Sequence, residues 1–221
     1  MKEKIDTNNE ESRFRDVPYI DPRLVEEYQD ESHPDFERGW EKNPAVWQGN
    51  GKLVEGGKVY SDGFSRCTAF VIKNPDSKWG GMFHIQDIDF EVEHQKLLKE
   101  FFINWLDSIS PEPAEKEKLA SAIEDICFYR YPKTFKREEI APKLKALGID
   151  KIRTKLFGGD TGRYYIDSRL RASLLEFLGV DLPPTTVFQD YHRHWAILAD
   201  FDADVVKVNI PYKRQVLEYD F

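Results

Sequence analysis

The stretch that decides the fold runs Ser61-Asp-Gly-Phe-Ser-Arg-Cys67-Thr-Ala-Phe-Val-Ile72 and continues, after a turn, as Trp79-Gly-Gly-Met-Phe-His84. Residues 68–72 are apolar and rich in β-branched and aromatic side chains, which predicts a buried strand. Turn-forming residues at 74–77 then lead into a second strand over residues 78–83. The sequence therefore predicts a β-hairpin within a single α/β domain.

Cys67 and His84 lie on either side of this apolar run. Because a hairpin returns the chain beside itself, we expect the thiol and the imidazole to be close to each other. A thiol with an adjacent base is the minimum equipment for covalent acyl transfer. On composition alone, a lone buried cysteine is more often a small apolar core residue, and that alternative remains open at this point.

The same residues carry a resemblance to a known family. Ser-Arg-Cys67 before an apolar strand and Gly-Gly-Met-Phe-His84 at the end of the next resemble the CheD-type chemoreceptor glutamine deamidases, and more distantly the catalytic domain of the cytotoxic necrotizing factor toxins. Lys155-Leu-Phe-Gly-Gly-Asp160 resembles the family's Lys-x-Phe-Gly-Gly segment, and Ile166-Asp-Ser-Arg-Leu170 resembles the helix that follows it. The matching segments lie between residues 55 and 210.

The resemblance implies a layered α/β sandwich of mixed, largely antiparallel sheets with flanking helices. It also implies a protein glutamine deamidase that uses no cofactor and no metal. Cys67 would be the nucleophile, as a thiolate beside a His84 imidazolium, and His84 would act first as general acid and then as general base. Ser61 stands where the family carries a hydroxyl residue that orients the histidine.

Substrate-binding residues are expected around the nucleophile and in the later glycine pair. The backbone N–H of Cys67, together with that of Arg66 or Ser65, is the expected source of oxyanion stabilisation. Gly158 and Gly159 could let a substrate backbone approach closely, but a tight turn explains both glycines equally well.

Several positions depart from the family pattern. Phe64 and Ser65 stand where the family usually has a Leu-Gly pair, and Arg66 directly precedes the nucleophile. Late paired glycines are replaced by Phe188-Gln-Asp-Tyr-His192. These changes alter the expected pocket wall, so the identity of the family's substrate does not transfer to this chain.

Other histidines give weaker signals. His94 is expected on a helix face without a chemical role. His192 and His194 could bind a metal together with Asp190, but three ligands in one short irregular segment are weak evidence, and surface histidines are the commoner explanation. We therefore expect no metal site.

The composition is that of a globular protein in a reducing compartment. The chain has 221 residues, 40% of them hydrophobic, and a net charge of −8, which argues against general nucleic-acid binding. Its two cysteines cannot make a disulfide framework. Because neither a secretory signal nor an apolar run of about 18 residues is present, we expect a cytoplasmic protein without membrane insertion.

Two regions are expected along the chain. Residues 1–50 read as a flexible acidic arm and connecting segment, and residues 51–221 as the deamidase-like domain. A helical insert at about 91–150 is either a partner-recognition element or a layer that covers a sheet. Helices are expected over residues 91–106, 119–127 and 138–147, and late strands over 185–188, 195–199 and 205–208.

The leading functional hypothesis is a cysteine-dependent protein glutamine deamidase. Its partner would be a protein that presents a glutamine, either a chemoreceptor or a host signalling protein. The second case would make the chain a bacterial effector delivered into a host cell. A transglutaminase using the same Cys-His pair and an inactive protein-binding module are the alternatives, and the sequence leaves the oligomeric state open.

Overall fold

The computed structural model describes residues 36, 38–64, 67–85, 91–109, 111–128, 136–158, 165–180, 186–188, 195–211 and 215–221. The arm predicted over residues 1–35 lies outside them. Within them, the protein is a mixed α/β protein with two β-sheets and five α-helices.

The first sheet is built around the predicted hairpin, which the structure confirms. Four antiparallel strands have the spatial order β1-β4-β3-β5, and a short strand β6 runs parallel to β5 at the edge. The bounds are β1 Gly51–Glu55, β3 Thr68–Lys73, β4 Trp79–Ile85, β5 Arg153–Gly158 and β6 Thr186–Phe188. In the turn between β3 and β4, the side chain of Asn74 accepts a hydrogen bond from the N–H of Asp76 at 2.9 Å.

The second sheet joins one early strand to three late ones. Its order is β2-β7-β8-β9, with every neighbouring pair antiparallel. The bounds are β2 Lys58–Phe64, β7 Trp195–Asp200, β8 Val205–Ile210 and β9 Gln215–Asp220. Strands from both ends of the domain therefore share one sheet, and the late strands expected over residues 195–199 and 205–208 are confirmed.

The first sheet is covered on both of its faces. Along β3, Ala69 and Val71 belong to an apolar cluster shared with the second sheet, whereas Phe70 and Ile72 belong to a cluster shared with the helices. This alternation follows from the twofold repeat of side chains along a strand. All six residues of β3 are consequently buried, as is typical of a strand that is covered on both sides.

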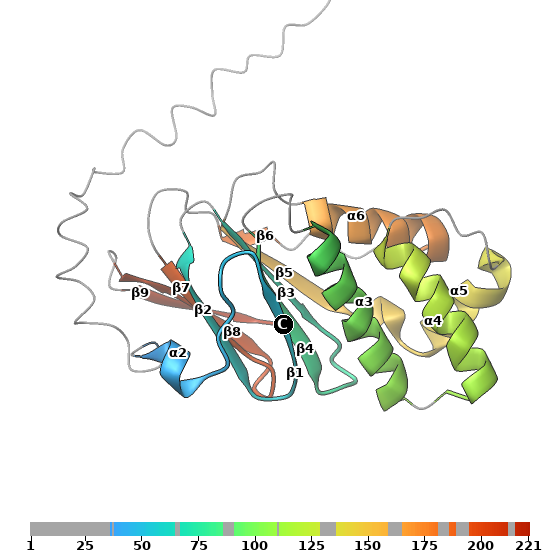
Figure 1. The fold of residues 1–221 in the computed structure, drawn as a ribbon, viewed down its shortest axis with the longest axis horizontal. Helices are drawn as coiled ribbons and strands as arrows, with labels where there is room; N and C mark the ends of the chain where they lie inside the picture. The colour runs from blue at the N-terminus through green and yellow to red at the C-terminus, as the bar shows by residue number, and fades with distance from the viewer. Residues whose placement is uncertain are drawn as a thin grey trace, which may run out of the picture.

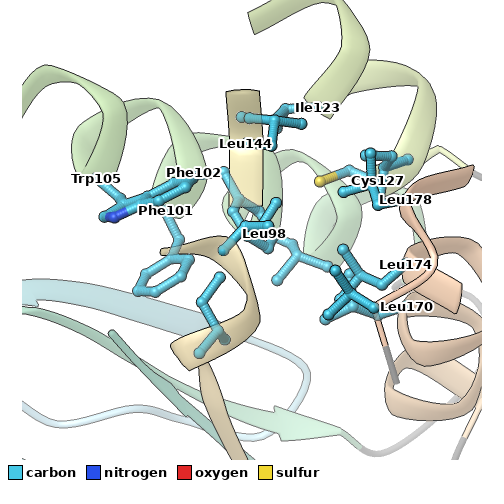
Figure 2. Close-up of a cluster of buried hydrophobic side chains, with 14 of the residues drawn as sticks. Leu98, Phe101, Phe102, Trp105, Ile123, Cys127, Leu144, Leu170, Leu174 and Leu178 are labelled. Atoms are coloured by element: carbon cyan, nitrogen blue, oxygen red, sulfur yellow. The ribbon is translucent and has the colours of Figure 1, made fainter. Parts of the chain in front are cut away.

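The four longer helices pack on one side of the first sheet (Figure 1). They are α3 Glu91–Ser108, α4 Pro113–Cys127, α5 Arg137–Ala146 and α6 Tyr165–Ser173. The short α2 Gly39–Lys42 lies instead beside β2 of the second sheet. Figure 2 shows that α3, α4, α5 and α6, with the π-helical segment Leu174–Leu178, contribute apolar side chains to one cluster. The insert predicted over residues 91–150 is thus a helical layer covering a sheet.

One helix carries much of the contact with this sheet. Among the α3 side chains in the cluster, Leu98, Phe101 and Trp105 have no exposed surface. Burial of side chains of this size stabilises the fold by roughly 1.5–3 kcal/mol each.

Within the described ranges, no helix is both long and apolar enough to cross a membrane.

Candidate functional site

The register of the hairpin places Cys67 and His84 on the same face of the first sheet. His84 pairs directly with Ala69 across β3 and β4. Cys67 precedes Ala69 by one strand repeat, so its side chain points to the same side as that of His84. Both residues face the second sheet, where Cys67 joins the apolar cluster between the sheets. Both are also buried, with 4% of Cys67 and 1% of His84 exposed.

Ser61, the predicted orienting residue, contacts the histidine. Its Oγ lies 2.9 Å from His84 Nδ1 and 2.6 Å from the carbonyl oxygen of Val46. A serine hydroxyl has one proton, and the Val46 carbonyl can only accept. The hydroxyl therefore donates to Val46 and accepts from Nδ1–H of His84, which leaves Nε2 as the unprotonated nitrogen of the neutral ring.

Aromatic rings hold the imidazole between the two sheets. The Phe64 ring stacks on His84 with the ring centroids 3.8 Å apart, and its other face stacks on Trp195 at 4.2 Å. Phe64 ends β2 and Trp195 begins β7, and these two residues are paired in the second sheet. The sequence marked Phe64 as a departure from the family pattern, and the structure places it against the imidazole.

A segment that the sequence treated only as a connection contacts all three predicted catalytic residues. We call residues 46–50 the bracing segment. Its Val46 carbonyl accepts from Ser61, the Gln48 amide Nε2 donates to Cys67 Sγ at 3.5 Å, and the N–H of Gly49 donates to the His84 carbonyl at 2.9 Å. The N–H of His84 donates to the carbonyl of Asn50, also at 2.9 Å.

The sequence pattern did not indicate that residues 46–50, the bracing segment, contact the site. This segment carries no catalytic motif, and its contacts arise because it folds back against β2 and β4. Val46 is buried, and Gly49 is also buried at a positive φ of 79°. Gln48, by contrast, is exposed overall and reaches the nucleophile only through its side-chain amide.

A second histidine is buried near the first. His94 on α3 has no exposed surface and meets the Phe83 ring edge-on, with centroids 5.9 Å apart. The backbone of Gly49 and Asn50 lies beside it and favours its charged form, although burial outweighs that effect and lowers its pKa to about 4. The sequence placed His94 on a helix face correctly but gave no sign of its burial beside the bracing segment.

Burial determines the charge of His84. Loss of hydration, with a smaller contribution from nearby His94, lowers the His84 pKa to about 4. The ring is therefore neutral near pH 7, which differs from the imidazolium expected from the sequence. Among the described residues, His84 Nε2 has no hydrogen-bond partner, so the Cys67 thiol and the imidazole are not hydrogen-bonded in this structure.

Gly158 is required by the fold itself. Its φ is +65°, and a Cβ atom at this position would lie 2.2 Å from Cζ2 of Trp195. Of the two explanations that the sequence allowed, local backbone geometry thus accounts for Gly158 without a ligand. It ends β5 opposite Thr68, the residue after the nucleophile.

Other predicted positions cannot be placed. Ser65, Arg66 and Gly159 lie outside the described residues, as do Asp190, His192 and His194. In the part of the chain that the structure describes, no group of three or more His, Cys, Asp or Glu side chains is arranged to hold a metal ion.

The chain was compared with protein-family models and with curated protein sequences. No family model matches it, and no curated sequence matches it significantly.

Proposed function

We propose that this protein is a cysteine-dependent protein glutamine deamidase with a CheD-like layered sandwich fold. The observation that carries the proposal is the hydrogen bond between Ser61 and His84, with Cys67 on the same face of the sheet. Cys67 is the nucleophile, His84 is the base, and Ser61 orients the base. The three residues follow the chain order of the family that the sequence resembles.

The reaction begins with neutral His84. Its Nε2 accepts the thiol proton as Cys67 Sγ attacks the carboxamide carbon of a glutamine side chain, so the S–C bond forms and the C=O electron pair moves onto oxygen. When this tetrahedral intermediate collapses, the C–N bond breaks and the Nε2 proton leaves with ammonia. His84 Nε2 then takes a proton from water as the water oxygen bonds to the thioester carbon; the C–S bond breaks, the proton on Nε2 passes to Sγ, and glutamate and the free thiol are formed.

Burial fixes the starting charge of the base. With a pKa of about 4, His84 is unprotonated throughout the neutral range, so its Nε2 lone pair is available, and the same low pKa makes the ring a weak base whose protonation must accompany the attack of Sγ. Ser61 holds the ring with Nδ1 protonated, so Nε2 is the nitrogen left for the thiol proton. The substrate class in this proposal is a protein that presents a glutamine side chain, either a chemoreceptor or a signalling protein of a host cell.

The test is mass spectrometry of candidate protein substrates after incubation with the enzyme. The wild-type protein is expected to convert one or more glutamines to glutamate with release of ammonia, and Cys67→Ser and His84→Ala are expected to abolish the conversion. Cys127→Ala is the matched thiol control, because Cys127 lies in the helical cluster away from the site. A fully active Cys67→Ser protein would exclude the mechanism.

The same chemistry could end in transglutamination if an amine, rather than water, resolved the thioester. Adding a primary amine to the assay separates the two outcomes. A deamidase still yields glutamate, whereas a transglutaminase incorporates the amine into its substrate.

A protein-binding module that has lost the chemistry is the second candidate. It is favoured by the burial of Cys67 and by the missing hydrogen bond to His84 Nε2 among the described residues. Iodoacetamide distinguishes the two, because Cys127 has no exposed surface and burial raises its thiol pKa. Alkylation of Cys67 much faster than Cys127 supports the enzyme, and equally slow alkylation of both supports the binding module.

A further inference from the structure

The side-chain amide of Gln48 contacts the nucleophile. Its Nε2 donates to Cys67 Sγ at 3.5 Å, a normal length for a hydrogen bond to sulfur. Gln48 is exposed, whereas Cys67 is buried, so this amide lies where the surface meets the thiol.

The backbone on both sides of Gln48 is held by hydrogen bonds. The next residue, Gly49, donates its N–H to the His84 carbonyl at 2.9 Å, and the side chain of Asn50 donates to the Gln48 carbonyl at 3.3 Å. The N–H of Asn50 closes a turn onto the Trp47 carbonyl at 2.9 Å. The backbone that carries Gln48 is thus bonded to the same strand, β4, that carries the base.

We propose that Gln48 is a further catalytic residue, whose side-chain N–H donates to the oxyanion that forms when Cys67 attacks a carboxamide. This inference rests on the proposed deamidase function. As the S–C bond forms, the electron pair of the C=O bond moves to oxygen and the thiol proton moves to His84 Nε2. The new oxyanion is bonded to the carbon that Sγ attacks, so a donor already at Sγ is within reach of it.

The chemistry of an amide suits this task. A glutamine N–H donates at every working pH and does not compete with His84 for the thiol proton. A donor that is oriented before reaction and partly shielded from water stabilises developing charge strongly, and removal of one such donor typically costs about 10²–10³ in rate. The oxyanion donors expected from the sequence are backbone N–H groups at Cys67 and at Arg66 or Ser65, and Gln48 would add a side-chain donor.

The experiment compares two reactions of the same thiol in the full-length protein. Acylation by p-nitrophenyl acetate passes through an oxyanion, whereas alkylation by iodoacetamide does not. Both rates are measured for the wild type, Gln48→Ala and Gln48→Glu, with Cys67→Ser to identify the reacting thiol. Gln215→Ala is the matched control, because Gln215 is an exposed glutamine on β9, two strands away from Trp195.

We expect Gln48→Ala to lower the acylation rate of Cys67 by about 10²-fold or more, whereas its alkylation rate, which feels only the lost hydrogen bond to Sγ, should fall far less. Gln48→Glu keeps the shape but has no proton to donate, and its negative charge beside Sγ should also raise the pKa of the Cys67 thiol, so this variant should lose acylation at least as strongly as Gln48→Ala and lose part of its alkylation as well. Circular dichroism should be unchanged in both variants, since the replaced side chain is exposed.

Each other outcome overturns the inference in a distinguishable way. Unchanged acylation in Gln48→Ala, with Cys67 still required, removes Gln48 from the mechanism and leaves the deamidase proposal standing. If Gln48→Ala lowers the rates of acylation and alkylation equally, Gln48 acts on the reactivity of the thiol and does not stabilise the oxyanion. A wild-type Cys67 that reacts with neither reagent overturns the inference and the proposed function together.

Discussion

Ser61 Oγ lies 2.9 Å from His84 Nδ1 and donates its own proton to the Val46 carbonyl at 2.6 Å. Because the hydroxyl proton is used by Val46, the bond to the histidine must run from Nδ1–H to Oγ. Ser61 therefore fixes both the tautomer and the orientation of a buried ring, and its replacement should alter both.

Ser61→Ala should lower kcat by about 5- to 150-fold, the range that corresponds to a loss of about 1–3 kcal/mol for a buried hydrogen bond. Ser61→Thr, which keeps the hydroxyl, should retain most of the activity. The tautomer gives an independent measurement: ¹⁵N NMR of His84 should show Nδ1 protonated in the wild type and a mixture of tautomers in Ser61→Ala. A single unchanged tautomer in Ser61→Ala would contradict the assignment.

The stability of the protein should fall in mild acid because two histidines are buried in their neutral form. His84 and His94 each have a pKa of about 4 when folded, against 6.5 as the ordinary value. Between these values the unfolded chain binds more protons, so the stability is complete above pH 6.5 and is lost as the pH falls toward 4. One pKa unit corresponds to about 1.4 kcal/mol, so each histidine can cost up to about 3 kcal/mol.

Urea unfolding at about pH 7.5 and about pH 5 measures this loss. His94→Leu removes one of the two rings, so the difference in unfolding free energy between the two pH values should be smaller in that variant. Equal unfolding free energies at both pH values in the wild type would show that the rings are not buried in their neutral form.

The hairpin could be predicted because its signal is local. The apolar run ending at Ile72, the turn after it and the strand before His84 lie within one short stretch of chain, and the observed register keeps Cys67 and His84 on one face. The three helices that follow were also predicted, since their apolar positions repeat with the helical period. Resemblance, and not periodicity, pointed to Ser61.

The bracing segment could not be predicted because its partners are distant in sequence, and the last strand could not be predicted because its burial pattern is mixed. Gln48 meets Cys67 only after residues 46–50 fold against β2 and β4. Strand β9, Gln215–Asp220, has mixed burial and is ordered by its pairing with β8. The burial of His94 likewise depends on where α3 packs, which a helical pattern alone does not state.

Gly158 should be intolerant of any side chain, for two independent reasons. Gly158→Ala places a Cβ in a left-handed backbone conformation, which costs about 1–2 kcal/mol, and drives it into Trp195, which adds about 1–3 kcal/mol. Gly57→Ala is the matched control, because Gly57 has a similar φ of +75° but nothing within 4 Å of the added atom. Thermal and urea unfolding should rank Gly158→Ala clearly below Gly57→Ala. Equal losses would remove the contact with Trp195 from the argument.

Phe64 should control the pKa of His84, because its ring covers one face of the imidazole at a centroid distance of 3.8 Å and an interplanar angle of 15°. Phe64→Leu keeps an apolar side chain and removes this stack. Water should then hydrate the ring more readily, so the pKa of His84 should rise from about 4 toward its ordinary value of 6.5.

An NMR pH titration of His84 in the wild type and in Phe64→Leu measures this shift directly. Phe70→Leu is the matched control, because Phe70 lies on the opposite face of the same sheet, in the cluster shared with the helices. That variant should lose stability through the smaller side chain while the pKa of His84 stays at its wild-type value. The same pKa in all three proteins would mean that the stack with Phe64 does not protect the imidazole, and that the rest of the inter-sheet core alone keeps His84 neutral.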